Sequence, residues 1–283
     1  MNSDTNDCYK IPALAIEDGI PIFSQTDFYI ENYDKISYDH VSAITSDSEN
    51  PWITEKVWNE MEVGTLQLVL KYLEGNSNKR ILDVGVGMGR LLGKIKEDYP
   101  GQLELYGVDI SSHYLRLAHS KGLNVAMAKI EDMPYKNEYF DMITCTDVLE
   151  HVEDLNLCVR KIIDCLKPGG IFIVRVPNRE DLSSYLNPDY PYDLAHVRGF
   201  DEYSLELLFT RIFRQELLEK APGLLIVNAA LIKYKLPFKG YHFLVINWLR
   251  MLKKMSNKWH DWTIEKLYYP TEINMVLRKP KDE

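Results

Sequence analysis

The stretch RILDVGVGMGR, residues 80–90, places three alternating glycines directly after a short apolar run that contains one acid, Asp83. A strand gains nothing from Gly85, Gly87 and Gly89, and a helix would be weakened by them. The pattern is typical of a tight turn after a buried strand, where a bare backbone approaches a ligand. It predicts that this turn forms part of a binding site.

Outward from this turn, short apolar runs alternate with amphipathic segments along most of the chain. Apolar runs of this length are typical of buried parallel strands, and their alternation with helices indicates a doubly wound α/β sheet. We predict a Rossmann-like sheet of seven strands: residues 79–86, 103–110, 124–130, 139–149, 171–178, 223–234 and 273–280. The predicted helices are residues 51–75, 89–99, 112–122, 153–170, 201–213 (with Asp201 as N-cap) and most of 241–269.

The chain divides into an N-terminal arm or lid, residues 1–50, and one domain, residues 51–283. The arm shows only weak periodicity, so we expect an irregular segment with short elements. Within the domain, the polar, Pro- and Tyr-rich residues 179–200 are predicted to form a loop that faces the site. Residues 237–269 are predicted to be a helical insertion before the last strand.

Composition and charge exclude several classes of protein. The 283 residues carry a formal net charge of −9, which disfavours broad nucleic-acid binding. No apolar run is long enough for a membrane span, and the N-terminus lacks the basic start and apolar core of a secretory signal. The four cysteines include no CxxC pair, which argues against a zinc site or a disulfide framework. We therefore expect a cytoplasmic protein.

Two kinds of ligand compete for the glycine turn. A dinucleotide fingerprint requires the spacing G-x-G-x-x-G, but Arg90 stands where its third glycine belongs. The carboxylate of Asp83 would also repel a pyrophosphate. A carboxylate suits a cationic ligand better, and this argues against a nicotinamide-dependent oxidoreductase.

Five stretches resemble, in order and at normal spacing, the motifs of the class I S-adenosylmethionine (SAM)-dependent methyltransferases. They are LDVGVGMGR, LYGVDIS, KIEDMPYKNEYFDMIT, DVLEHVED and LKPGGIFIVRVPN. The resemblance covers roughly residues 55–215 and implies the fold predicted above. It implies an enzyme that uses SAM, a ligand with an ammonium and a sulfonium, and releases S-adenosylhomocysteine (SAH).

The resemblance assigns cofactor roles residue by residue. Asp109 ends the second strand, where a carboxylate can accept both ribose hydroxyls. The family often has an Asp where this chain has Lys129, so the adenine amine meets Glu131, Asp132 or backbone near Ile130. The predicted cofactor-binding residues are Tyr33, Asp83, Gly85, Gly87, Gly89, Arg90, Asp109, Ile110, Ile130, Glu131, Asp132, Thr146 and Asp147.

Each of the acids in this set also has a purely structural interpretation. Asp83 could cap the end of its strand, and Asp109 could be the N-cap of the following helix. Asp132 could be a turn residue before Met133-Pro134. A tyrosine of the arm, where Tyr29, Tyr33 and Tyr38 are the candidates, is expected to contact the carboxylate end of SAM. The sequence does not distinguish them, and Tyr33 is the one included in the predicted set. The segment IEDGIPIF resembles the tail of a zinc-ribbon module fused to some relatives, but only Cys8 remains of its metal ligands.

His196 and His151 are the predicted catalytic residues. His151 lies just past the fourth strand, where this fold opens its site, and His196 lies in an H-x-R-x-F segment of the acceptor loop. Either histidine could instead fix a loop. We predict no metal. The alternative is that Asp147, Glu150 and His151, which resemble the D/E-x-x-E-H pattern of quinone-pathway O-methyltransferases, hold a divalent ion as in some of those enzymes.

The segment 241–258 combines a broad apolar face with a cluster of basic side chains. Such a helix can lie on an anionic membrane surface or meet a lipid-linked acceptor, cap a pocket, or pair with a second subunit in a homodimer. It can equally be an insertion helix that faces the core. The acidic arm, with ten Asp and Glu in residues 1–50, could also meet this basic segment.

We therefore predict a SAM-dependent methyltransferase that acts on a small-molecule or glycan acceptor, with a sugar hydroxyl first. Relatives with this loop pattern often lie in polysaccharide or natural-product pathways. The alternatives are N-methylation of an amino sugar, methylation of a phenol or quinone precursor, and a SAM-binding partner protein without activity. The Asn/Asp-Pro-Pro-Tyr motif of amino-directed DNA methylation is missing, which also argues against a nucleic-acid acceptor.

Overall fold

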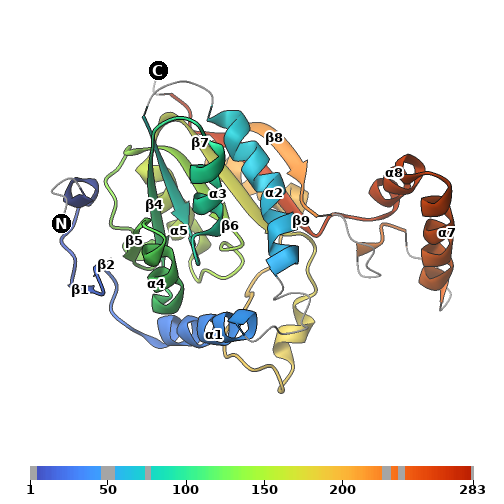
Figure 1. The fold of residues 1–283 in the computed structure, drawn as a ribbon, viewed down its shortest axis with the longest axis horizontal. Coiled ribbons are helices and arrows are strands. Elements are labelled where there is room, and N and C mark those ends of the chain that lie inside the picture. Colours follow the sequence, from blue (N-terminus) through green and yellow to red (C-terminus); the bar gives the residue numbers. More distant parts are fainter. Residues whose placement is uncertain (1–4, 46–54, 74–77, 225–230, 235–239, 282–283) are drawn as a thin grey trace.

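A computed structural model describes residues 5–45, 55–73, 78–224, 231–234 and 240–281 of the chain (Figure 1). In this described part, nine strands form one sheet in the order β1-β2-β5-β4-β3-β6-β7-β9-β8. The strands are β1 (Ala15–Glu17), β2 (Ile20–Ile22), β3 (Lys79–Val84), β4 (Leu103–Asp109), β5 (Asn124–Met127), β6 (Phe140–Thr146), β7 (Leu166–Pro177), β8 (Glu216–Pro222) and β9 (Glu272–Arg278).

The centre of the sheet has the predicted doubly wound topology. Strands β5, β4, β3, β6 and β7 are parallel, and β9 then pairs antiparallel with both β7 and β8. The two strands beyond the predicted seven form a short antiparallel hairpin, β1–β2, which joins the sheet through β5. The α/β class is therefore confirmed, with a larger sheet than predicted.

Helices cover both faces of the sheet. The helices are α1 (Phe28–Thr45), α2 (Glu55–Tyr72), α3 (Arg90–Asp98), α4 (Ser112–Ser120), α5 (Leu155–Cys165), α6 (Glu202–Leu207), α7 (Tyr241–Met255) and α8 (Asn257–Leu267). Apolar side chains of α2, α3 and α4 pack in the core on one face, and those of α5 and α6 pack in the core on the other. Buried apolar runs in β3 and β6 separate the two cores, which explains why these strands read as continuous hydrophobic segments.

Two sequence predictions need correction. The strand predicted at 223–234 is not observed where the chain is described. Residues 225–230 lie outside the described residues, and the strand that pairs with β9 is β8, at Glu216–Pro222. The arm contains an 18-residue helix, α1, in place of an irregular segment. Its buried face is largely polar, with Asn32 and Ser37 bonded to other segments, so it shows little hydrophobic periodicity.

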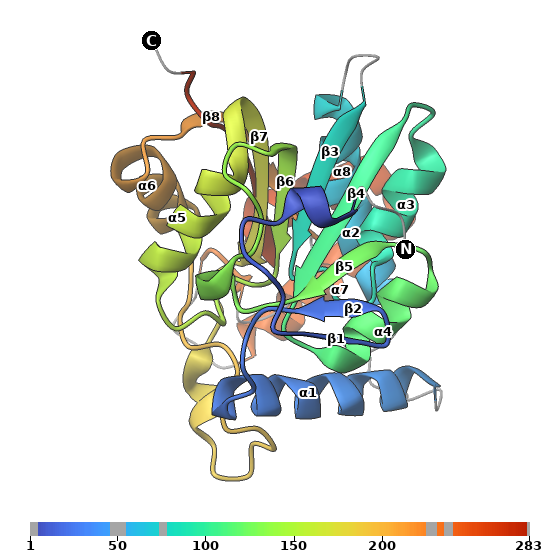
Figure 2. The ribbon, with the colours of Figure 1, turned by 90° about the vertical axis from the view of Figure 1, so that its left-hand side faces the viewer.

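Helix α1 lies across one end of the sheet, next to the β1–β2 hairpin and α4 (Figure 2). The predicted N-cap Asp201 is confirmed, because its side chain accepts the backbone N–H of Ser204 in a capping box that starts α6. A single π-helical turn, Leu208–Ile212, follows.

The predicted insertion 237–269 contains α7 and α8, while its residues 237–239 lie outside the described part. This helix pair stands apart from the body of the sheet (Figure 1). Its own small core joins Leu249 of α7 to Ile264 and Tyr268. Among the described helices, none is both long and apolar enough to cross a bilayer.

Candidate functional site

The glycine turn joins β3 to α3 through three residues with positive φ. Gly85, Gly87 and Gly89 have φ angles of 74°, 51° and 72°, a conformation that side chains rarely adopt. A Cβ at Gly85 would lie 2.2 Å from a methyl carbon of Val148, and one at Gly89 would lie 2.4 Å from Leu123. At Gly87 there is open space instead, because its backbone borders a cavity.

A cavity of about 980 Å³ lies at the carboxyl ends of β3, β4, β6 and β7, and α1 forms part of its wall. This is where ligands bind in open α/β sheets. The sequence-predicted residues that line it are Tyr33, Asp83, Gly85, Gly87, Arg90, Asp109, Ile110, Ile130, Glu131, Thr146, Asp147, His151 and His196. Two predicted residues do not line it. Gly89 instead packs closely against Leu123 and Ala118, and Asp132 is hydrogen-bonded to Ser24 of the N-terminal arm.

Asp83 is the buried acid of the glycine turn. Its side chain is 2% exposed and accepts a 2.6 Å hydrogen bond from the Thr144 hydroxyl. Burial raises the pKa of this carboxyl to about 7, although the Thr144 hydroxyl works in the opposite direction. A cation bound in the cavity beside Asp83 would stabilise the ionised form of this carboxyl group.

Asp109 ends β4 and faces the same cavity. One carboxylate oxygen accepts the backbone N–H of Gly87 and the other that of Ser111, each at 2.9 Å. Burial raises the pKa of Asp109, and these backbone donors oppose the shift. Each oxygen keeps capacity for one further donor. The N-cap of α4 is Ser111, whose hydroxyl accepts from Tyr114, so the interpretation of Asp109 as that cap is wrong.

Glu131 and Asp132, the two acids after β5 that we predicted as adenine contacts, have different surroundings in the structure. Ile130 and Glu131 line the cavity. Asp132 instead accepts a 2.7 Å hydrogen bond from the Ser24 hydroxyl, outside the cavity wall, so its interpretation as an adenine contact is not supported. Lys129 forms a 2.5 Å ion pair with Asp27, which ties this segment to the start of α1.

Asp147 is held by Arg175 of β7 rather than left free for a ligand. The guanidinium donates to both oxygens of Asp147, the shortest contact being 2.5 Å, and also to the backbone carbonyl of Met61 and the hydroxyl of Thr65 on α2. Arg175 is 2% exposed. Asp147 has a positive φ of 56°, which is uncommon for a residue other than glycine, and the partly buried ion pair stabilises it at the start of the loop that carries Glu150.

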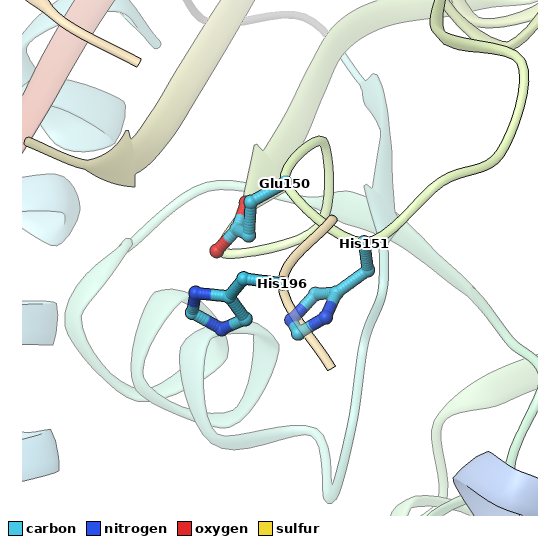
Figure 3. Close-up of side chains that lie close together, drawn as sticks. All are labelled: Glu150, His151 and His196. Carbon is cyan, nitrogen blue, oxygen red and sulfur yellow. The ribbon is translucent and has the colours of Figure 1, made fainter. Parts of the chain in front are cut away.

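Glu150, His151 and His196 come together beyond Asp147 (Figure 3). One ligand atom from each lies within 4.8 Å of the others. Neither carboxylate oxygen of Glu150, which is 1% exposed, has a hydrogen-bond partner among the described residues. Burial and the nearby Asp147 raise the pKa of Glu150 well above its usual range. Burial and the neighbouring His196 lower the pKa of His151 to about 3.

Both histidines are oriented through their Nδ1 atoms. The Nδ1 of His196 contacts a carboxylate oxygen of Glu180. The Nδ1 of His151 lies 2.8 Å from the hydroxyl of Tyr33 on α1, so the assigned arm tyrosine contacts this cluster. Glu180 was not predicted from the sequence. It lies 16 residues before its partner in an irregular loop, where no periodicity signals the contact.

Comparisons with known proteins find methyltransferases. Residues 82–174 match the family model described as a methyltransferase domain. The chain is 28% identical over 116 residues to the ubiquinone/menaquinone biosynthesis C-methyltransferase UbiE of Geotalea daltonii, a match that covers 38% of this chain and 49% of that protein. It is 27% identical over 162 residues to the ubiquinone biosynthesis O-methyltransferase of Bordetella avium, covering 54% and 65%.

Among solved structures, the chain resembles phosphoethanolamine N-methyltransferase 2 of Haemonchus contortus in complex with S-adenosyl-L-methionine. The TM-score is 0.56 at 17% identity, over 90% of this chain and 61% of that chain. This likeness shows the fold. The matches span less than two thirds of the length of each of these three proteins.

Proposed function

We propose that this chain, whose residues 82–174 match the model of a methyltransferase domain, is a class I SAM-dependent methyltransferase that transfers a methyl group from SAM to a hydroxyl of a small-molecule or glycan acceptor. A sugar hydroxyl is the first acceptor we would test. One observation carries the proposal: the two carboxylates of Asp83 and Asp109 and the histidine pair line the same cavity.

The residues present fit SAM as the cofactor. Asp109 has spare acceptor capacity on both oxygens for the two ribose hydroxyls, and Asp83 is a buried acid that favours a nearby cation. The open space at Gly87 allows the backbone to approach a ligand closely. When bound, SAM supplies a methyl group on a sulfonium, which leaves as a neutral thioether.

The chemistry then demands alignment and removal of one proton. The acceptor oxygen must lie in line with the methyl carbon and lose its proton as the new bond forms. His151 and His196 line the part of the cavity that also contains Tyr185 and Tyr190. Aromatic rings that carry hydroxyls suit a sugar or a phenol. We therefore assign the acceptor to this end of the cavity and the two histidines to its reacting oxygen.

Calorimetric titration with SAH tests the cofactor assignment, with NAD as the control. We expect micromolar binding of SAH alone, and its loss in Asp109→Ala. Binding of NAD would overturn the proposal. Binding of SAH without turnover in a screen of nucleotide sugars, amino sugars and phenols would favour a SAM-binding partner protein. In that screen, methylation of an amino sugar at nitrogen, or of a phenol or quinone precursor, would replace the sugar hydroxyl as acceptor.

A further inference from the structure

The cluster of Glu150, His151 and His196 brings one carboxylate and two imidazoles into a single space. Glu150 and His151 follow β6, and His196 comes from the loop after β7, so only the folded chain assembles them. Figure 3 shows the three side chains lying close together. The set differs from the sequence alternative of Asp147, Glu150 and His151, because Arg175 takes Asp147 and His196 enters in its place.

Glu150 is the feature that the protein alone does not explain. Both oxygens of this carboxyl group, which is 1% exposed, lack a hydrogen-bond partner among the described residues, and burial of such a group costs free energy. The nearest buried cation, Arg175, is already committed to Asp147. A cation bound between Glu150 and the two histidines would supply the missing partner.

The outer contacts of the cluster suit metal ligation. The Nδ1 atoms of His151 and His196 are engaged by Tyr33 and Glu180, which leaves Nε2 of each ring as a donor. An imidazole whose other nitrogen is hydrogen-bonded to a carboxylate or hydroxyl is the usual arrangement around a protein-bound metal. Two histidines and one carboxylate are a known ligand set for Zn²⁺ and for other divalent transition metals, with coordination positions left open.

We propose that Glu150, His151 and His196 bind a divalent transition-metal ion at the acceptor end of the cavity. Its role, unlike its binding, rests on the proposed function. An acceptor hydroxyl in an open coordination position loses its proton to solvent, because the cation lowers the hydroxyl pKa. The oxygen–carbon bond then forms as the sulfur–carbon bond breaks, so the products are the methyl ether, SAH and one proton.

Metal binding can be measured without any acceptor. Tag-free protein, stripped by a chelating resin, is titrated with Co²⁺ by visible absorption and with Zn²⁺ by calorimetry. We expect one equivalent, and at least tenfold weaker binding in Glu150→Gln and in His196→Ala. His119→Ala, which removes an exposed histidine on α4, is the matched control and should bind as the parent does.

SAH titration of the same variants separates the two proposals. Failure of SAH binding in the parent protein would refute the proposed function and leave the metal result intact. Absence of a stoichiometric Co²⁺ spectrum, or an equal loss in His119→Ala, would overturn the metal site. If His196→Ala does not fold, the Glu150→Gln variant, which keeps the side-chain volume, decides the matter alone.

A second inference comes from a different surface, the outer face of α7. Leu244, Trp248, Met251 and Met255 recur at helical spacing and are 59%, 45%, 52% and 74% exposed. Another side of the helix is buried, since Leu249 packs in the small core with α8. The stripe is therefore an exposed apolar face that takes no part in the α7–α8 core.

Charge and aromatic content indicate what covers this face. Trp259 and Trp262 of α8 are also more than half exposed. The segment 241–258 contains Arg250, Lys253, Lys254 and Lys258 and no acid, in a chain whose net charge is −9. Exposed tryptophans and leucines beside a basic cluster are typical of helices that lie in the headgroup layer of anionic membranes.

We further infer that the α7–α8 pair docks on an anionic lipid surface. Flotation with phosphatidylcholine vesicles that contain phosphatidylglycerol should recover the protein, and pure phosphatidylcholine should recover much less. Added salt should weaken the binding. The double variant Trp248→Ser/Met255→Ser should lose vesicle binding, whereas Tyr203→Ser, which removes an equally exposed aromatic from α6, should not.

The α7 face could instead be covered by a second copy of the chain, and light scattering after size exclusion tests this by measuring the mass in solution. A dimer that the double variant abolishes, without vesicle binding by the parent protein, would overturn the lipid assignment. Equal recovery on neutral and anionic vesicles would also refute it.

Discussion

Replacement of Asp83 by Asn should make the ligand-free protein more stable, and the gain should depend on pH. The side chain is 2% exposed, and burial raises its pKa from 3.8 to about 7. The folded state therefore retains a proton that the unfolded chain releases. This cost to stability is absent below pH 3.8, grows as the pH rises toward 7, and stays constant above it.

The linkage relation turns this shift into a magnitude. From a folded pKa of about 7 and an unfolded value of 3.8, the wild-type carboxyl costs about 4 kcal/mol at pH 8 and about 2 kcal/mol at pH 5. Asn avoids the cost, and its carbonyl oxygen can still accept the Thr144 hydroxyl. Asp83→Asn should thus exceed the wild type in free energy of unfolding, by clearly more at pH 8 than at pH 5.

Urea denaturation at pH 5 and pH 8 measures the difference in free energy of unfolding between Asp83→Asn and the wild type. Calorimetric titration measures how much weaker the variant binds SAM and SAH. Both SAM and SAH carry an ammonium, but only SAM carries a sulfonium. Weaker binding of both to Asp83→Asn at pH 8 would place the ammonium near Asp83, and weaker binding of SAM alone would place the sulfonium there. A variant that is no more stable than the wild type at pH 8, or a gain of equal size at both pH values, would refute the reasoning.

Three further predictions follow from the same structure. Gly87→Ala should cost roughly 1–2 kcal/mol of stability from its positive φ alone, whereas Gly85→Ala should lower the melting temperature further, because its Cβ would meet Val148 at 2.2 Å; equal effects would argue against the clash. Arg175→Met should destabilise the fold by about 3–5 kcal/mol in urea denaturation, since it leaves Asp147 without its cation; a change below 1 kcal/mol would show that solvent reaches the pair. None of the four cysteines forms a disulfide, all are buried, and burial raises their thiol pKa, so a disulfide reagent at pH 8 should label the folded protein slowly and the denatured protein at once; rapid labelling of the folded state would contradict this burial.

The parts of the fold that follow local rules could be predicted well. Strands β3, β4, β5, β6 and β7 each contain a run of buried, mostly apolar residues, and the helices between them bury one apolar face each. Helix α1 escaped prediction because its inward face is made of polar groups such as Asn32, whose amide bonds to residues 193 and 194 of a distant loop. Strand β8 was misplaced, because its pairing with β9 depends on a non-local partner rather than on its own half-exposed pattern.

The sequence by itself determined the five parallel strands at the centre of the sheet, the glycine turn and the two acids at strand ends, because periodicity and glycine spacing are local properties of the chain. The tertiary structure alone decided which acids remain available. Asp147 is taken by an arginine 28 residues away, Asp132 by Ser24 across the arm, and Glu150 is left unpartnered beside His151 and His196. These outcomes depend on which loops meet at the end of the sheet, and a short-range sequence pattern carries no information about such contacts.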